Sequence, residues 1–263
     1  MTRRLETIAE LRSWRQGLPA GPGFVPTLGG LHAGHQSLIR RSLDENEHTV
    51  VSLFLNPTQF DRADDLAAYP AVLADDLAVL ERLGVAAVFV PSQDALYPDG
   101  FAYRVVETRL ARELEGAHRP GHFEGVLSVV LKLFELVRPR RAYFGEKDWQ
   151  QLELIRGMVE AFFLPVEIVP CATVRDPDGL ALSSRNRRLT PTAREQAAEL
   201  YRILGRAGSA DQAREALGAA GFAVDYVVDR DQRRLAAVVL DGVRLIDNIP
   251  LKARPPGGPE NPE

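Results

Sequence analysis

Two histidines near the start of the chain stand three residues apart, directly behind a glycine-rich turn. His32 and His35 follow a short apolar segment, residues 23–26, and the pair Gly29 and Gly30. At the start of a helix both side chains would share one face, where unpaired backbone N–H groups and the helix dipole attract anions. The pattern favours a phosphate site. Two surface histidines or half of a metal site are the alternatives.

Neutral amide side chains follow the next apolar segment, residues 49–55. Asn56 and Gln59 stand just beyond it, at what would be the carboxyl end of a strand, where open α/β sheets bind their ligands. Amides hydrogen-bond hydroxyl and carboxylate oxygens without fixing a charge, which suits a hydroxy acid. A plain polar turn would show the same residues.

A third junction of strand and helix follows residues 141–144. Gly145 precedes Lys147 and Asp148, and Gln151 would lie on the first turn of the next helix. A lysine ammonium is a compact charge that suits a phosphate. An aspartate at a helix start can hold ribose hydroxyls, and it can equally cap the helix. This junction therefore predicts a nucleotide contact at the same edge of the sheet.

A polar loop farther along the chain carries two hydroxyl groups beside a guanidinium. Ser183, Ser184 and Arg185 stand in an irregular stretch between two differently patterned regions. Such a set is suited to clamping phosphoryl oxygens when a loop closes. An exposed polar loop without a ligand is the other interpretation.

The elements that must position these groups are short β-rich runs that alternate with helical patterns. The runs cover residues 23–26, 49–55, 85–90, 141–144 and 166–174. Apolar residues recur at helical spacing between them, as ordinary core faces, over residues 73–83 and 126–137. The alternation predicts an α/β fold with a parallel sheet flanked by helices.

The pattern changes after about residue 175. Two helices are expected at residues 191–206 and 211–220, and three short strands near residues 223–228, 234–240 and 243–246. We therefore predict a catalytic domain at residues 1–175, a smaller C-terminal α+β domain at residues 176–254, and a Pro/Gly-rich flexible tail at residues 255–263.

Composition limits the partners and the compartment. The 32 Lys and Arg residues against 36 Asp and Glu give a net charge of −4, which predicts no nucleic-acid partner. The single cysteine, Cys171, excludes internal disulfides and cysteine-rich zinc sites. The sequence contains neither a signal-peptide pattern nor a long uncharged apolar stretch. We expect a cytoplasmic protein without a membrane partner.

Five motifs in order resemble the pantothenate synthetase family over nearly the whole chain. They are Pro-Thr at 26–27 with His-x-Gly-His at 32–35, Asn-Pro-Thr-Gln-Phe at 56–60, His-Phe-x-Gly-Val at 122–126, Gly-Glu-Lys-Asp-x-Gln-Gln at 145–151 and Leu-Ser-Ser-Arg-Asn at 182–186. The resemblance implies an ATP-dependent condensation of pantoate with β-alanine through a pantoyl-adenylate, releasing AMP and pyrophosphate. It also implies a Rossmann-like domain, a C-terminal lid and a homodimer.

The resemblance assigns roles to individual residues. It implies that the catalytic groups are His32, His35, Lys147 and Arg185. The ATP-binding positions would be His32, His35, Gly145, Lys147, Asp148, Val174, Leu182, Ser183, Ser184 and Arg185. The pantoate-binding positions would be Asn56, Gln59, Gln151, Arg119 and His122. Asp75 and Asp76 match acidic residues near Mg²⁺.

Three other functions remain open on the residues alone. Another H-x-G-H nucleotidyltransferase would release a nucleotidyl product, although Asn56, Gln59 and Gln151 weigh against it. A histidine-based zinc hydrolase would combine the first histidine pair with His118 and His122. A regulatory module would bind ATP without forming AMP. For the ligase, the base that deprotonates β-alanine is not evident, and His35 is one candidate.

Overall fold

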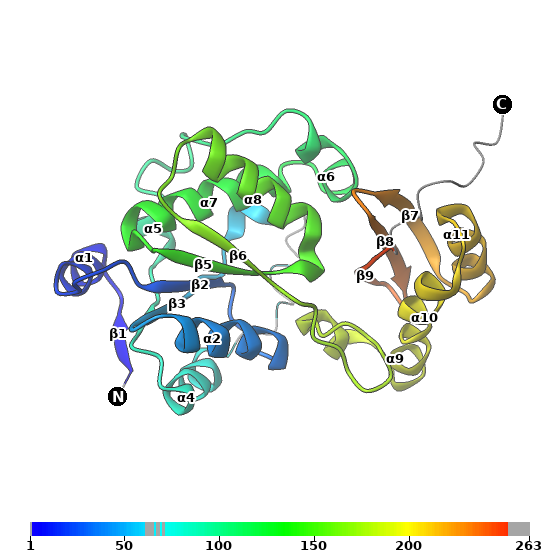
Figure 1. Cartoon of the computed structure of the whole chain (residues 1–263), viewed down its shortest axis with the longest axis horizontal. Coiled ribbons are helices and arrows are strands. Elements are labelled where there is room, and N and C mark those ends of the chain that lie inside the picture. The colour runs from blue at the N-terminus through cyan, green and yellow to red at the C-terminus, as the bar shows by residue number, and fades with distance from the viewer. Residues whose placement is uncertain (1, 61–65, 67–68, 70–71, 252–263) are drawn as a thin grey trace. The chain divides into compact units, whose positions relative to one another are not determined.

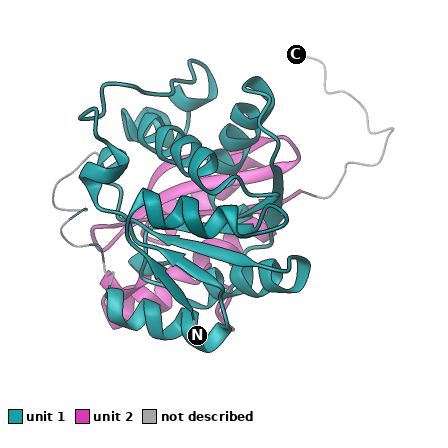
Figure 2. Cartoon of the chain, turned by 90° about the vertical axis from the view of Figure 1, so that its left-hand side faces the viewer, with its two compact units in different colours: residues 1–175, 182–185 teal, residues 176–181, 186–263 magenta. Residues whose placement is uncertain are grey.

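The computed structural model describes residues 2–60, 66, 69 and 72–251, and these divide into two compact units (Figures 1 and 2). Unit 1 holds residues 1–175 together with 182–185, and unit 2 holds residues 176–181 together with 186–263. The segment 182–185, which we expected in the smaller domain, clusters with unit 1, where the backbone N–H of Leu182 donates to the carbonyl oxygen of Val174. The predicted tail lies outside the described residues.

Unit 1 is built on one six-stranded sheet in which every strand pair is parallel. The strands are β1 (Arg3–Leu5), β2 (Gly23–Thr27), β3 (Thr49–Leu53), β4 (Ala87–Phe89), β5 (Arg141–Gly145) and β6 (Glu167–Cys171). The predicted parallel sheet is confirmed. The five expected strands are present, and β1 was missed because only Leu5 of its three residues is apolar, which gives no β-rich run.

The strand order β1-β4-β3-β2-β5-β6 creates a switch point in the middle of the sheet. Strand β2 pairs with β3 on one side, where Gly23 lies opposite Thr49, and with β5 on the other, where Gly23 lies opposite Arg141. Connections leave β2 and β5 in opposite directions. In open α/β sheets, ligands bind outside the carboxyl ends of the strands at such a point.

Helices cover both faces of this sheet (Figure 1). They are α1 (Ile8–Gln16), α2 (Ala33–Glu45), α4 (Leu73–Leu83), α5 (Gln93–Leu96), α6 (Glu115–His118), α7 (His122–Val137) and α8 (Trp149–Ala161), with 3₁₀ turns η1 (Pro57–Gln59), η2 (Leu110–Arg112) and η3 (Glu146–Asp148).

Successive residues of a strand pack against the helices on opposite faces of the sheet. Phe24 packs with residues of α1, α7 and α8, whereas Val25 packs with residues of α2 and α4. This is the alternation of side chains that a strand imposes.

Unit 2 contains helices and one antiparallel sheet. The helices are η4 (Ser184–Arg188, which begins in unit 1), α9 (Pro191–Ala197), α10 (Glu199–Arg206) and α11 (Ala210–Ala219), and the strands are β7 (Ala223–Arg230), β8 (Arg233–Leu240) and β9 (Val243–Pro250). The three predicted strands are confirmed and run longer than expected. The helix predicted over 191–206 is two helices that meet at Ala198.

Tight hairpins explain the longer strands of unit 2. Asp231 and Gln232 both have positive φ, as do Asp241 and Gly242, which is the two-residue turn that suits twisted antiparallel strands. Within the residues that the structure describes, no helix is long and apolar enough to cross a membrane.

Candidate active site

A cavity of about 250 Å³ lies within unit 1, where residues that follow β2, β3, β5 and β6 come together. Every residue expected at the nucleotide or at pantoate lines it: His32, His35, Asn56, Gln59, Arg119, His122, Gly145, Lys147, Asp148, Gln151, Val174, Leu182, Ser183, Ser184 and Arg185. Asp75 and Asp76 do not. The structure thus brings together groups from six separate stretches of sequence.

The turn at the start of α2 fixes the proton on both imidazoles. The Gly34 N–H donates to Nδ1 of His32 over 3.1 Å, and the His32 N–H donates to Nδ1 of His35 over 3.4 Å. Each Nδ1 therefore acts as an acceptor, so the ring proton of each neutral imidazole sits on Nε2. Both rings carry an N–H donor on the side away from the helix backbone.

Gly34 makes this arrangement sterically possible. A Cβ atom at that position would stand 2.8 Å from Cε1 of His32, which folds back over the turn. The two imidazole rings lie with centroids 4.1 Å apart. Burial, followed by the neighbouring His32, lowers the pKa of His35 to about 3, so His35 is neutral near pH 7. With its Nε2 protonated, it cannot take a proton from β-alanine, and it does not fit the role of base.

A charged group follows β5 at the next strand end. Nζ of Lys147 lies 3.5 Å from Oδ1 of Asp148, at the junction of η3 and α8. Burial tends to raise the pKa of Asp148, but Lys147 and Arg185 outweigh it and the pKa is lowered. Asp148 is therefore ionised, within the field of both cations.

Asn56 is completely engaged by other parts of the protein. Its Oδ1 accepts from Oγ1 of Thr58 and from the hydroxyl of Tyr97, both over 2.9 Å. Its Nδ2 donates to Oε1 of Gln59 over 3.1 Å and to the carbonyl oxygen of Gly125 over 3.2 Å. Its side chain has no accessible surface. Asn56 thus lines the cavity without offering it an unused hydrogen-bonding position.

A glycine lets helix α7 reach this amide turn. A Cβ atom on Gly125 would overlap the backbone carbonyl of Thr58. Only a residue without a side chain allows the helix to approach η1 closely enough for the Gly125 carbonyl to accept from Asn56. The glycine of the His-Phe-x-Gly-Val motif therefore has a packing role beside the cavity.

Arg119 and His122 form the next part of the wall. Nδ1 of His122 lies 2.7 Å from the backbone carbonyl of Gln59, so Nδ1 carries the ring proton and donates. Nε2 then accepts from NH1 of Arg119 over 3.2 Å. Burial, followed by the Arg119 cation, lowers the pKa of His122 to about 4. A neutral His122 thus holds the guanidinium of Arg119 beside Gln59.

The two acidic residues expected near Mg²⁺ occupy other positions. Asp75 is exposed on α4. Asp76 is buried, and its two carboxylate oxygens accept from the backbone N–H groups of Gly30 and Leu31, each over 2.8 Å. Asp76 therefore holds the glycine turn in place with one hydrogen bond to each oxygen, and neither aspartate lines the cavity.

The described side chains also do not form a zinc-binding cluster. Across the described ranges, no group of three or more histidine, cysteine, aspartate or glutamate side chains is placed to hold a metal ion. The four-histidine site that the sequence left open is absent from that part of the chain.

Several cavity residues were missed by the sequence. Val126, Val129, Val130 and Leu133, which we assigned to an ordinary core face, also line the cavity, and so does Tyr69. Their helical spacing is the same for a core face and for an apolar cavity wall, so the pattern could not separate the two.

Gln150 was passed over in favour of its neighbour Gln151. It is buried, its Oε1 accepts from the N–H of Glu115 over 2.9 Å, and its Nε2 donates to the carbonyls of Leu110 and Glu113 over 2.7 and 2.8 Å. Gln150 thus ties α8 to the segment that leads to Arg119. Only its place in the Gly-Glu-Lys-Asp-x-Gln-Gln motif hinted at a role.

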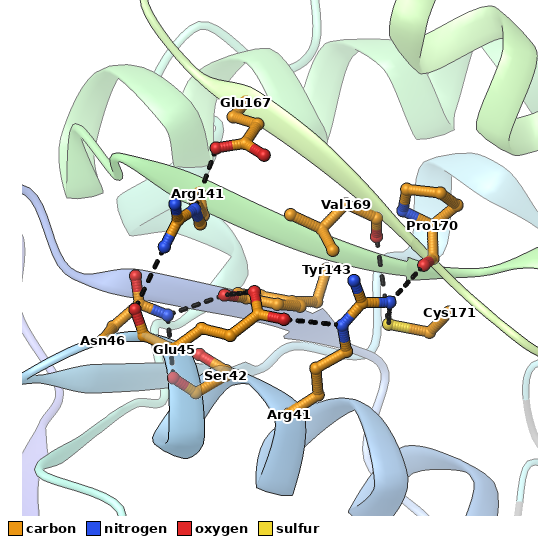
Figure 3. A network of polar contacts seen from close by, with 10 residues as sticks. All are labelled: Arg41, Ser42, Glu45, Asn46, Arg141, Tyr143, Glu167, Val169, Pro170 and Cys171. Atoms are coloured by element: carbon orange, nitrogen blue, oxygen red, sulfur yellow. Dashed lines mark hydrogen bonds and ion pairs between the residues drawn. The ribbon is translucent and has the colours of Figure 1, made fainter.

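The far end of α2 is fixed by a polar network (Figure 3). The hydroxyl of the buried Tyr143 on β5 donates to Glu45 over 2.9 Å and accepts from Asn46 over 2.7 Å. Arg41 donates to Glu45 and also to the carbonyl oxygen of Pro170 on β6. The helix that carries His35 is therefore attached directly to the strand that leads to Lys147.

Comparison with known proteins decides the family. The family model described as pantoate-beta-alanine ligase matches residues 3–250. The chain belongs to the pantoate–β-alanine ligase family. A pantothenate synthetase of Bdellovibrio bacteriovorus is 51% identical over 95% of this chain and 100% of its own length, and one of Coxiella burnetii is 49% identical over 95% and 98%.

Solved structures of this family share the fold. A pantoate–β-alanine ligase from Francisella tularensis, in complex with β-γ ATP and β-alanine, superimposes with a TM-score of 0.90 at 40% identity, covering 95% of this chain and 98% of that one. A pantothenate synthetase from Thermus thermophilus gives 0.87 at 45% identity, covering 95% and 99%. Pantoate–β-alanine ligases form an amide bond, and membership places this chain among them.

Proposed function

We propose that this cavity condenses pantoate with β-alanine in two steps. In the first step a carboxylate oxygen of pantoate attacks the α-phosphorus of ATP, and the bond from that phosphorus to the pyrophosphate oxygen breaks. In the second step the amine of β-alanine attacks the acyl carbon of the pantoyl-adenylate, and AMP leaves. The products are pantothenate, AMP and pyrophosphate, and no covalent bond to the protein is needed.

One observation carries this proposal: two differently built groups share a single cavity, and three cationic side chains, Arg119, Lys147 and Arg185, line it. In the charged group, Lys147 and then Arg185 lower the pKa of Asp148 against the effect of burial. The reaction must hold two anions, a carboxylate and a triphosphate, in contact. Cationic side chains at the cavity wall offset the repulsion that this contact creates.

The charged group suits the phosphates. The Nε2–H donors of His32 and His35 approach the phosphoryl oxygens as neutral hydrogen-bond donors, while Lys147 and Arg185 supply full charges. These groups stabilise the negative charge that develops as pyrophosphate leaves, and each contributes about 10²–10³ in rate. Ser183 and Ser184 add hydroxyl donors. Gly145, Asp148, Val174 and Leu182 hold the nucleoside.

The amide turn suits pantoate. Gln59 and Gln151 offer neutral amides to its hydroxyl groups, and Arg119, held by His122, offers a charge to its carboxylate. The apolar side chains that α7 contributes to the wall, Val126 among them, leave a surface for the methyl groups of pantoate. The ligand thus meets apolar surface on one side and a few placed polar groups on the other, the usual character of a small-molecule site.

The second step requires β-alanine to lose a proton. Neither His35 nor His122 can accept it, since both ring nitrogens of each are already committed in the geometry described above. We therefore assign no protein base, and water takes the proton from the amine before attack. The reactivity of the acyl-adenylate makes this sufficient.

Magnesium enters the proposal with the nucleotide, as Mg-ATP, and no step is assigned to a protein-bound ion. A homodimer, a cytoplasmic location and a lid role for unit 2 remain predictions of the family resemblance.

The direct test is to incubate the purified protein with Mg-ATP, pantoate and β-alanine and to measure AMP and pantothenate. Formation of both, dependent on all three substrates, is expected. A nucleotidyl product that accumulates in the presence of β-alanine would instead indicate a nucleotidyltransferase.

A further inference from the structure

Gln59 has one hydrogen-bonding group that the protein leaves unused. Its side chain lines the cavity and is 9% exposed. Its Oε1 accepts from Nδ2 of Asn56 over 3.1 Å. Among the described residues, no group accepts from its Nε2, which therefore remains a donor for a ligand.

The direction of the Gln59 amide depends on the direction of the Asn56 amide. One end of the Asn56 side chain faces the backbone carbonyl of Gly125 over 3.2 Å. A carbonyl can only accept, so this end must be the Nδ2 donor. The same Nδ2 faces Gln59, so the atom of Gln59 nearest to it must be the oxygen. The backbone of Gly125 thus determines, through Asn56, which end of Gln59 turns away from Asn56.

Tyr97 holds the other end of Asn56. Its hydroxyl donates to Oδ1 of Asn56 over 2.9 Å, and its ring is 5% exposed. The ring packs against Phe54 and Phe101, with centroids 6.2 and 5.3 Å away, and Nζ of Lys132 lies 4.8 Å from its centroid. Tyr97 itself does not line the cavity, so its hydroxyl reaches a ligand only through its hydrogen-bond partners Asn56 and Thr58.

We propose that Tyr97 and Asn56 are positioning residues that lock the Gln59 amide with its NH₂ group toward the substrate, where it donates to an oxygen of pantoate. The inference rests on the proposed function for the identity of the substrate. It assigns to Asn56 a role different from direct contact, because all four of its hydrogen-bonding positions are occupied by the protein. An acceptor at this point would repel an anionic substrate.

The orientation of Gln59 is tested by comparing Gln59→Glu with Gln59→Ala. Glutamate retains the size and the acceptor that faces Asn56, but it replaces the NH₂ donor with a second oxygen. If the donor faces pantoate, Gln59→Ala raises the KM for pantoate about tenfold to a hundredfold, and Gln59→Glu raises it further. A Gln59→Glu variant that binds pantoate better than Gln59→Ala would overturn the assignment.

The positioning role is tested with a double-mutant cycle of Tyr97→Phe and Gln59→Ala. Phenylalanine retains the buried ring and removes one of the hydrogen bonds to Asn56, so the KM for pantoate should rise about threefold to tenfold, with the KM for ATP within twofold of wild type. In the Gln59→Ala background the same change should have no further effect beyond about twofold. A merely structural role for Tyr97 would produce the same penalty in both backgrounds.

Controls separate the possible failures. Tyr103→Phe alters a tyrosine that is 80% exposed and should leave all three KM values unchanged. Thermal unfolding checks that each variant is folded at the assay temperature. If the wild-type protein forms AMP and pantothenate but Tyr97→Phe has no effect, or an equal effect in both backgrounds, the inference fails and the proposed function stands. If the wild-type protein forms neither product, both fail.

Discussion

The two turns that follow the adjacent strands β2 and β3 are built in different ways. In the first, the imidazoles of His32 and His35 are oriented by backbone N–H groups two and three positions away, and only the preceding glycine turn depends on a distant residue, Asp76. The second, which carries Asn56 and Gln59, is held by Tyr97, Gly125 and His122, which lie 41, 69 and 63 positions away from their partners.

This difference separates two tasks. A phosphate needs N–H donors at a helix start, and a short motif can supply them. Recognition of a hydroxy acid needs amides whose orientation is fixed, and that requires hydrogen-bond partners from several elements. We expect substitutions near the first turn to impair mainly the kinetics with ATP. Substitutions near the second turn should impair mainly the kinetics with pantoate.

The largest effect is expected from Lys147→Ala, next to the phosphate-binding turn. Loss of a full charge at the phosphates should lower kcat about 10²–10³-fold, measured as pyrophosphate release with and without β-alanine. Lys147→Arg, which retains the charge, should recover part of the loss. A folded Lys147→Ala variant with unchanged turnover would remove Lys147 from the phosphate site.

The comparison itself is tested by two glycine replacements. In Gly34→Ala the new Cβ stands 2.8 Å from the His32 ring, and the displaced imidazole should raise the KM for ATP about tenfold, since the clash corresponds to about 1–3 kcal/mol. In Gly125→Ala the new Cβ meets the Thr58 carbonyl, and the KM for pantoate should rise by a similar factor.

Gly157→Ala is the matched control for both replacements, because its added Cβ meets no atom within 4 Å beyond the backbone of its own helix and its chain neighbours. Its kinetics should equal those of wild type. The distinction between the two turns would be lost if Gly34→Ala and Gly125→Ala impaired ATP and pantoate equally.

A smaller effect concerns pH. The pKa of His122 is lowered to about 4 in the folded protein, whereas an unfolded chain titrates near 6.5. Between these values the unfolded state binds the additional proton, so the free energy of unfolding decreases as the pH falls from 6.5.

The variant His122→Asn tests this pH dependence, because asparagine retains a donor toward Gln59 and does not titrate in this range. From pH 6.5 to 5 its unfolding free energy should decrease by about 1.5 kcal/mol less than that of wild type. Equal pH dependence in urea denaturation would contradict the assignment.

The smallest effect on catalysis is expected from Tyr143→Phe, at the far end of α2 (Figure 3). The lost hydroxyl bonds Glu45 and Asn46, and both can turn to water, so stability should fall by about 1 kcal/mol. The KM values for ATP and pantoate should stay within twofold of wild type. A selective rise in the KM for ATP would show that the network at the far end of α2 also orients the histidines of the first turn.

The sequence predicted what is encoded locally. Strands β2 to β6 were recognised because their apolar runs are bounded by turns and helices, and the H-x-G-H turn because its residues contact one another. Strand β1 was missed because it contains a single apolar residue, Leu5, and the break at Ala198 was missed because it leaves the helical periodicity almost intact.

The sequence could not predict contacts between residues that lie far apart in the chain. It grouped Asp75 with Asp76, although only Asp76 turns inward to bond Gly30 and Leu31, 46 and 45 positions away. It named Asn56 but not Tyr97, which has no neighbour in a motif. Local chemistry identifies a residue, while the direction in which its amide or imidazole points is decided by partners that only the fold brings near.

The central claim, that pantoate is activated at the α-phosphorus in this cavity, is tested most directly by isotope transfer. Pantoate labelled with oxygen-18 in its carboxylate is incubated with Mg-ATP and β-alanine, and AMP, inorganic phosphate and pantothenate are analysed by mass spectrometry. Attack on the α-phosphorus leaves one labelled oxygen in AMP for each pantothenate formed. Label in inorganic phosphate with release of ADP, or pantothenate formed without label in AMP, would contradict the account.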